Sequence, residues 1–378
     1  MKSWVKGKLS LTHLSWAIVI LLAGLFIAEQ TKSIQPNYYF NEQIRAAQLM
    51  KICLETIKEE RLKRNIPLDI ELDPNQTGII GKEYTQLTTT LGNLEAKRTS
   101  TNPAFAALLV KYFKEVNLKK GDTVAIGASG SFPGLILATL SAVKALELKP
   151  LLIYSIGSSE YGANIPEFTF VPMLDSLNKR NILPYHLLAI SMGGYLDQAQ
   201  GMFYPDSQEI IEQIARDSEV LFINTDNIPE NIQQRMQLYR RTAKGQPIKA
   251  FVNIGGATPN YGNTNASITY PNGLVINGPK IPDHPERGLI FEYQSLRIPI
   301  IHLLNIRDLA AKNGLPIDPI PLPEIGEGGV YRQTSYNKVI IFLVIGIEFF
   351  YIFWALKNKR KFYKIGVTSV YQTGRPIK

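Results

Sequence analysis

A loop of small residues at positions 127–131, with the sequence GASGS, has the composition best suited to ligand chemistry. It follows a short apolar run at 123–126 and precedes a helix-like segment that begins near Pro133. Glycine lets a ligand approach the backbone closely, and the N–H groups at a helix N-terminus attract anions. The loop matches neither the Gly-x-Gly-x-x-Gly nor the Walker A pattern. It therefore predicts either a phosphate or carboxylate site, or only tight packing of a helix on a sheet.

The same loop contains two hydroxyl groups, Ser129 and Ser131, that are candidate nucleophiles of a hydrolase or transferase. A serine nucleophile needs a base, and His284 is the candidate, because His186 and His302 lie beside or within predicted strands. The loop departs from the Gly-x-Ser-x-Gly elbow at its last position. The imperfect elbow and the small number of histidines favour binding over catalysis.

Apolar runs and polar loops alternate along the chain, and this pattern indicates the elements that would position these residues. The runs predict strands at 123–126, 151–155, 187–190, 220–223, 250–254 and 300–304. Several are followed by helix-like segments, and this alternation is typical of βαβ units. We therefore expect an α/β fold with a mainly parallel, Rossmann-like sheet, whose ligand site lies beyond the carboxyl ends of its strands.

The loops that follow these strands contain the candidate ligand-binding residues, which are mostly small and neutral. They are Gly127, Ser129, Gly130, Ser131, Ser158, Ser159, Glu160, Asn164, Gly193, Gly194, Asp226, Gly255, Gly256, Asn305 and Arg307. Loops of this kind supply N–H donors and suit recognition of an anion. The carboxylates are scattered and no His/Cys cluster occurs, so we expect no metal and no cofactor. Residues 86–98 are polar enough to line a cleft or to lie on the surface.

Two apolar segments, 9–28 and 339–356, are each long enough to be a transmembrane helix. No Ala-x-Ala pattern precedes a cleavage point after the first, so we interpret it as an uncleaved anchor rather than a signal peptide. Glu348 is the one charge inside the second segment. A carboxyl at that depth is costly unless it is protonated or finds a partner, for example on a facing helix of another subunit.

The charge distribution predicts the orientation of these segments. Residues 1–28 contain three lysines and no acid, and residues 357–378 contain seven basic residues and no acid. These groups, less Glu348, account for the whole net charge of +9, so the stretch 29–338 is neutral overall. This pattern follows the positive-inside rule and is not a nucleic-acid footprint. We expect a protein of the cytoplasmic membrane with both termini in the cytoplasm and the main domain outside it.

The expected domain organisation follows from these boundaries. Residues 1–8 and 357–378 would be cytoplasmic tails, 29–98 a stalk helix and entry region, and 99–337 the extracytoplasmic α/β domain. A helix is expected over about 37–64, and another from Asn102–Pro103 to Val116. Cys53 is the single cysteine and falls in an apolar helical pattern, which favours a core position over a reactive thiol.

Residues 126–174 (IGASGSFPGLILATLSAVKALELKPLLIYSIGSSEYGANIPEFTFVPML), together with 99–103 (TSTNP), 191–194 (SMGG) and 253–256 (NIGG), resemble the bacterial family called poly-gamma-glutamate system protein. The resemblance covers most of the chain, and its long central block is the specific part. It implies a membrane-anchored accessory component of poly-γ-glutamate synthesis and export, with the other membrane subunits of that system as partners. The polymer carries one carboxylate per residue, which agrees with the predicted anion site. A serine-dependent hydrolase or transferase acting on γ-glutamyl chains is the alternative, since the resemblance assigns no catalytic residues.

Overall fold

The computed structural model describes residues 11–370, with side chains described as far as 357. It divides into residues 37–331, here called the α/β domain, and a separate unit built from the two ends of the chain. The sequence placed the start of the α/β domain near residue 99, whereas the structure groups 37–98 with it. The predicted tail 1–8 and the last eight residues of the predicted tail 357–378 lie outside the described residues.

Among the described residues of the α/β domain, seven strands form one sheet in the order β5-β4-β3-β2-β6-β8-β7. All neighbouring strands run parallel except β7 and β8, which are antiparallel. The mainly parallel sheet and all six predicted strands are confirmed, whereas β7 was not predicted. The strand bounds are β2 (Thr123–Ser129), β3 (Lys149–Ser155), β4 (Leu187–Ser191), β5 (Phe222–Ile223), β6 (Ile248–Ile254), β7 (Gly273–Val275) and β8 (Ile300–Leu303).

The central strand β2 is buried along its whole length, which explains its continuous run of apolar and small residues. Its side chains alternate between two cores. Val124 and Ile126 pack in the larger hydrophobic cluster, while Ala125 packs in a second cluster on the opposite face of the sheet. The strand continues three residues beyond the predicted end at 126, so Ser129 is its last residue and lies opposite Ser155 of β3.

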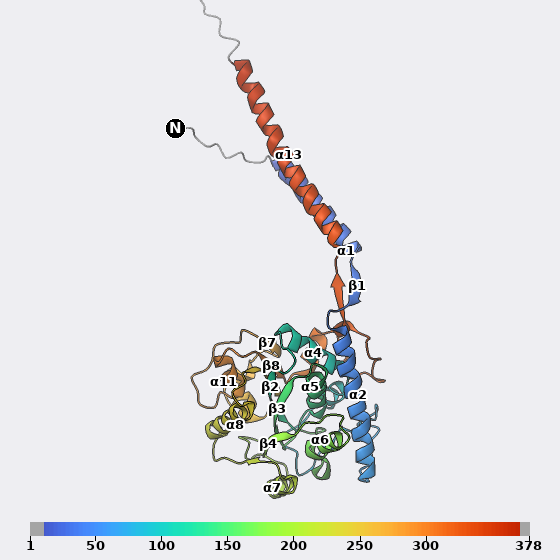
Figure 1. The fold of residues 1–378 in the computed structure, drawn as a ribbon, viewed down its shortest axis with the longest axis vertical. Helices are drawn as coiled ribbons and strands as arrows, with labels where there is room; N and C mark the ends of the chain where they lie inside the picture. The colour runs from blue at the N-terminus through green and yellow to red at the C-terminus, as the bar shows by residue number, and fades with distance from the viewer. Residues whose placement is uncertain (1–10, 371–378) are drawn as a thin grey trace, which may run out of the picture. The chain divides into compact units, whose positions relative to one another are not determined.

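Helices cover both faces of this sheet, giving three layers (Figure 1). The larger cluster includes residues of α2 (Phe40–Lys63), α4 (Ala104–Glu115), α5 (Pro133–Ala145), α6 (Phe170–Lys179), α7 (Ser207–Ser218) and α12 (Ile306–Lys312). The second includes α8 (Ile228–Ala243) and α11 (Leu289–Ser295). Shorter helical turns are α3 (Leu94–Thr99), η1 (Pro166–Phe168), α9 (Thr258–Tyr261), α10 (Asn265–Ile268) and η2 (Gly329–Tyr331).

Helix α2, the segment expected to be a stalk, is part of the core. It packs against α4 and α5 along a stripe at helical spacing that includes Met50, Cys53 and Ile57, all with no exposed surface. The predicted core position of Cys53 is therefore confirmed. The first and last residues of the α/β domain also meet, because the Asn37 N–H donates to the Tyr331 carbonyl oxygen at 3.0 Å.

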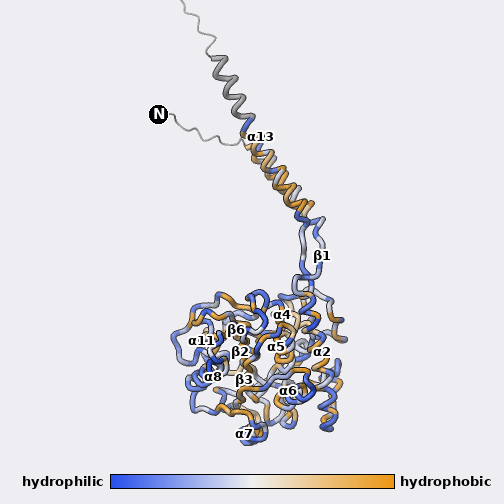
Figure 2. Tube along the Cα trace, viewed as in Figure 1, coloured by the Kyte–Doolittle hydropathy of each residue, from blue (hydrophilic) through white to orange (hydrophobic). Residues whose placement is uncertain are grey.

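The unit formed by the chain ends contains α1 (Leu11–Gln30), β1 (Ser33–Pro36), β9 (Arg332–Ser335) and α13 (Lys338–Val370). Strands β1 and β9 pair antiparallel with Ser33 opposite Ser335, and α1 packs against α13. Two stretches, Leu11–Gln30 and Lys338–Lys357, are long and apolar enough to cross a membrane (Figure 2). The Oε2 atom of Glu348 in α13 has no hydrogen-bond partner among the described residues.

Candidate functional site

The order of strands creates a crevice at the carboxyl end of β2. From β2 the chain continues through β3, β4 and β5 on one side, and then returns to β6 on the other side. At such a reversal the loops after the two central strands diverge and leave room for a ligand. A cavity of about 520 Å³ lies there, lined by the loops after β2, β3, β4 and β6 and by residues 89–97. Six predicted residues line it, namely Ser129, Ser131, Ser159, Gly193, Gly194 and Gly256.

Ser129 lies at the carboxyl end of β2 and is only 4% exposed. Its Oγ atom has no hydrogen-bond partner among the described residues, which is uncommon for a buried hydroxyl. Gly255, the first residue after β6, has a φ of +80° and lies against this oxygen, so that a side chain at Gly255 would collide with it. The hydroxyl therefore faces Gly255, and the Ser129 residue lines the crevice.

Lys97 of α3 is the main site residue that the sequence did not identify. Its side chain is 2% exposed and lines the crevice. The Nζ atom donates to Ser159 Oγ at 2.6 Å and to the Ser131 carbonyl oxygen, and it lies 4.1 Å from the centroid of the Phe132 ring. Burial lowers the pKa of the Lys97 ammonium to about 7, while the carboxylate of Glu160 opposes this shift.

The N-terminus of α5 opens at the same cavity. Pro133 occupies the first turn, as expected, and Ser131 and Phe132 line the cavity just before it. Neither backbone N–H of these two residues has a hydrogen-bond acceptor among the described residues. Unpaired N–H groups at the N-terminus of a 13-residue helix favour a negatively charged or polarised oxygen.

Several predicted residues lie outside the cavity lining and have structural contacts instead. A Cβ atom on Gly130 would lie 2.7 Å from the Ile156 carbonyl oxygen, and one on Gly127 would collide with Asn260. The Ser158 hydroxyl donates to the Ser159 carbonyl oxygen, Glu160 accepts from the Gly92 N–H, and Asn164 bonds with Lys82 and Thr88. These contacts hold together the loops that form the crevice walls.

The remaining predicted residues are exposed. Asn305 caps α12, Arg307 lies 3.7 Å from Glu95, and Asp226 follows β5 at the surface. His284 is exposed, does not line the crevice, and accepts a hydrogen bond from the Glu286 N–H within its own loop. The candidate catalytic set is thus divided: Ser129 and Ser131 line one cavity, and His284 lies elsewhere.

A buried ionic network lies next to the crevice and was also missed. Arg235 of α8 bonds with Asp197, and both side chains have no exposed surface. Arg235 also donates to the hydroxyls of Ser191 and Ser155, and Ser155 lines the cavity. In the sequence Arg235 follows a helical pattern that gives no sign of burial, so only the fold identifies it.

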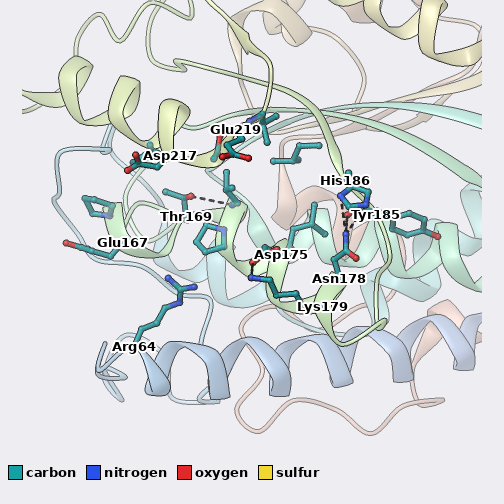
Figure 3. Close-up of a pocket in the computed structure, with 18 residues that line it drawn as sticks. Arg64, Glu167, Thr169, Asp175, Asn178, Lys179, Tyr185, His186, Asp217 and Glu219 are labelled. Carbon is teal, nitrogen blue, oxygen red and sulfur yellow. Dashed lines mark hydrogen bonds and ion pairs between the residues drawn. The ribbon is translucent and has the colours of Figure 1, made fainter.

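A second and larger cavity, of about 700 Å³, lies near the amino-terminal end of β4 (Figure 3). Its lining contains charges of both signs from α6, α7 and the end of α2. Lys179 pairs with Asp175 at 2.6 Å, and Asn178 bonds with His186 at 3.2 Å. Because these polar groups already have partners, this cavity is less suited to a specific ligand than the crevice at β2.

Comparison with protein-family models, with curated proteins and with solved structures gave no match. In the described part of the chain, no group of three or more His, Cys, Asp or Glu side chains is placed to hold a metal ion.

Proposed function

We propose that the crevice at the carboxyl end of β2 binds a carboxylate-bearing chain, and that the protein is a membrane-anchored accessory component of poly-γ-glutamate synthesis or export. The observation that carries this proposal is the buried Ser129 hydroxyl, which has no partner and lies in the same cavity as the Lys97 amine. A buried hydroxyl without a partner is costly, and a ligand oxygen would satisfy it.

The chemistry of the crevice is consistent with a γ-glutamyl chain as ligand. Each residue of that chain offers a carboxylate and an amide carbonyl, both of which accept hydrogen bonds. The N–H groups of Ser131 and Phe132, the Ser129 hydroxyl and Lys97 are all donors. The cavity is lined by several loops and has a volume of about 520 Å³, which suits a segment of a polymer.

The location of the protein belongs to the same proposal. The two apolar helices would anchor it in the cytoplasmic membrane, with the basic ends in the cytoplasm and the α/β domain on the other side. The reversal of strand order beside β2 supports a Rossmann-like assignment of the sheet. Other membrane subunits of the synthesis system would be its partners.

The sequence also left open a hydrolase or transferase that uses Ser129 or Ser131 with His284 as base. The exposed position of His284, in a loop outside the crevice lining, gives that arrangement no support. A serine-dependent reaction in this crevice would need a different base.

The test is calorimetric titration of the full chain in detergent micelles with a short oligo-γ-glutamate. We expect binding that is lost or reduced about tenfold in Ser129→Ala, which corresponds to one hydrogen bond to a charged group. Poly-α-glutamate of equal charge controls for simple ionic attraction. Equal binding of the two polymers, or unchanged binding in the variant, would contradict the proposal.

Ser207→Ala is the matched control for this variant. The Ser207 hydroxyl is also buried and without a partner among the described residues, but it belongs to α7 and does not line the crevice. Both substitutions remove an unsatisfied polar atom, so neither should lower the melting temperature. Only Ser129→Ala should change binding.

A further inference from the structure

Two serines of the crevice lining have hydroxyls that contact a basic side chain. Ser155 lies 3.3 Å from the Arg235 guanidinium, which does not give up its proton, whereas Ser159 contacts an amine that can. Ser159, in the loop after β3, is 9% exposed and lines the cavity, and its Oγ atom lies 2.6 Å from Lys97 Nζ. Nucleophilic serines are activated by a base at this distance. Ser131 differs, because its hydroxyl accepts a hydrogen bond from the Ser159 backbone N–H at 3.0 Å. Ser129 differs too, because it has no partner at all among the described residues.

The other contacts of Lys97 orient its amine toward Ser159. A neutral amine has two N–H bonds and one lone pair. The Ser131 carbonyl oxygen can only accept, so it takes one N–H, and the Phe132 ring face at 4.1 Å takes the other. In the ammonium form Nζ donates to Ser159 Oγ, whereas in the neutral form the remaining lone pair can accept the proton of the Ser159 hydroxyl at the same 2.6 Å contact. Burial favours this neutral form, because the pKa of Lys97 is lowered to about 7.

We propose that Ser159 is an acyl-transfer nucleophile and Lys97 its general base, so that the crevice cleaves or transfers the amide bond of a bound γ-glutamyl chain. The identity of the substrate rests on the function proposed above, whereas the pairing of nucleophile and base rests on the contacts of these two residues.

The reaction balances with water as the only co-reactant. Ser159 Oγ forms a bond to the γ-carbonyl carbon, and its proton passes to Lys97 Nζ. The C–N bond then breaks, and Lys97 returns that proton to the leaving amine nitrogen. Water attacks the resulting ester and gives a proton to Lys97, which passes it to Ser159 Oγ as the carboxylic acid leaves. The unpaired N–H groups of Ser131 and Phe132 are available to the carbonyl oxygen, where negative charge develops.

The experiment incubates the full chain in detergent micelles with γ-glutamyl-p-nitroanilide, as both the D and the L isomer. Release of p-nitroaniline is followed by absorbance, and an acyl adduct is sought by intact mass and peptide mapping. We expect release from one or both isomers and an adduct on Ser159. Ser159→Ala should lose the adduct and reduce the rate at least about 10²-fold.

Lys97→Arg tests the base. Arginine does not give up its proton in proteins, whereas the neutral Lys97 amine can accept one, so the variant cannot act as the base. We expect it to lose at least about 10²-fold in rate. Ser176→Ala, a buried serine of α6 away from the crevice, is the matched control and should react as the wild type does.

Each outcome decides one of the two proposals. An adduct on Ser129 or Ser131, or release that persists in Ser159→Ala, would overturn the role of Ser159. Binding of oligo-γ-glutamate by the wild type without release or adduct would overturn this pair and leave the binding function intact. An adduct on Ser159 without binding of the polymer would support the pair and overturn the polymer as ligand. Melting temperatures of all variants confirm that each is folded.

Discussion

Arg235 and Asp197 form an ion pair with an N–O distance of 3.0 Å, and neither side chain has any exposed surface. The carboxylate also accepts from the Ser191 hydroxyl, the Gly193 N–H and the Asn231 amide. Such a pair is tolerated inside a protein only when the remaining donors and acceptors are also satisfied. Gly193 and Ser155 line the crevice, and both form hydrogen bonds with this ion pair. The pair therefore holds two parts of the crevice lining in position.

Removing one member of this pair should destabilise the fold strongly. Asp197→Asn keeps the shape of the side chain and tolerates the φ of +58° at this position, but it leaves the Arg235 charge buried without a counterion. We expect the free energy of unfolding to fall by about 3–5 kcal/mol in denaturant titrations. Asp175→Asn, which breaks the exposed pair with Lys179, should change it by less than about 1 kcal/mol. If both substitutions lowered the free energy of unfolding by less than about 1 kcal/mol, the buried pair would not stabilise the fold as described.

Lys97 should make the stability of the α/β domain depend on pH. Its pKa is about 7 in the folded state and 10.5 in the unfolded chain, so between these values the unfolded state binds more protons. Stability then rises with pH over this range, and below pH 7 the full penalty of the buried charge remains. Compared with Lys97→Met, the wild type should gain about 1.4 kcal/mol per pH unit between pH 7 and 9. If the free energies of unfolding of the two proteins changed in parallel with pH, Lys97 would have the same pKa in the folded and unfolded states.

Two glycines of the predicted site should respond in opposite ways to alanine. A Cβ atom at Gly130 would lie 2.7 Å from the Ile156 carbonyl oxygen, so Gly130→Ala should cost about 1–3 kcal/mol in stability. Gly256 lines the crevice, and its Cβ would meet only Leu304 at 3.7 Å, an ordinary contact. Gly256→Ala should therefore keep its melting temperature and weaken binding of oligo-γ-glutamate. Loss of stability in Gly256→Ala, or none in Gly130→Ala, would refute this assignment.

The thiol of Cys53 should be inert in the folded protein. The side chain has no exposed surface, and burial raises the pKa of the thiol to about 12. Ellman's reagent at pH 8 should label it only after denaturant is added, at the rate of global unfolding. Rapid labelling of the native protein would mean that α2 separates from the core.

Much of the sheet could be predicted from the sequence, because buried parallel strands produce continuous apolar runs bounded by polar loops. The strand at 273–275 was missed because three residues with one glycine carry no periodic signal, and its pairing with β8 is set by tertiary contacts. The structure groups 37–98 with the α/β domain, which the sequence pattern could not indicate for a similar reason. An amphipathic helix such as α2 looks the same whether it packs on a stalk partner or on its own domain.

The candidate site was predicted in outline and not in its chemistry. The rule that ligands bind beyond the carboxyl ends of parallel strands selected Ser129, Ser131 and Ser159, and these three line one cavity. It also selected two loop residues that do not line the cavity. Asn305 caps α12, and Asp226 is exposed to solvent. Lys97 was missed because a lysine in a short polar helix is normally exposed, and only the packing of Phe132 and Ser159 around it shows its burial.

The contact between Asn37 and Tyr331 also has a thermodynamic consequence. The α/β domain begins and ends at one point, and α1 and α13, which flank it in the sequence, pack against each other. In the unfolded state the same pairing would close a loop of roughly 300 residues, which costs on the order of 5 kcal/mol in chain entropy. The two terminal helices thus act on the domain as a non-covalent cross-link. Insertion of both into one membrane would make unfolding of the domain less favourable without adding any contact to its core.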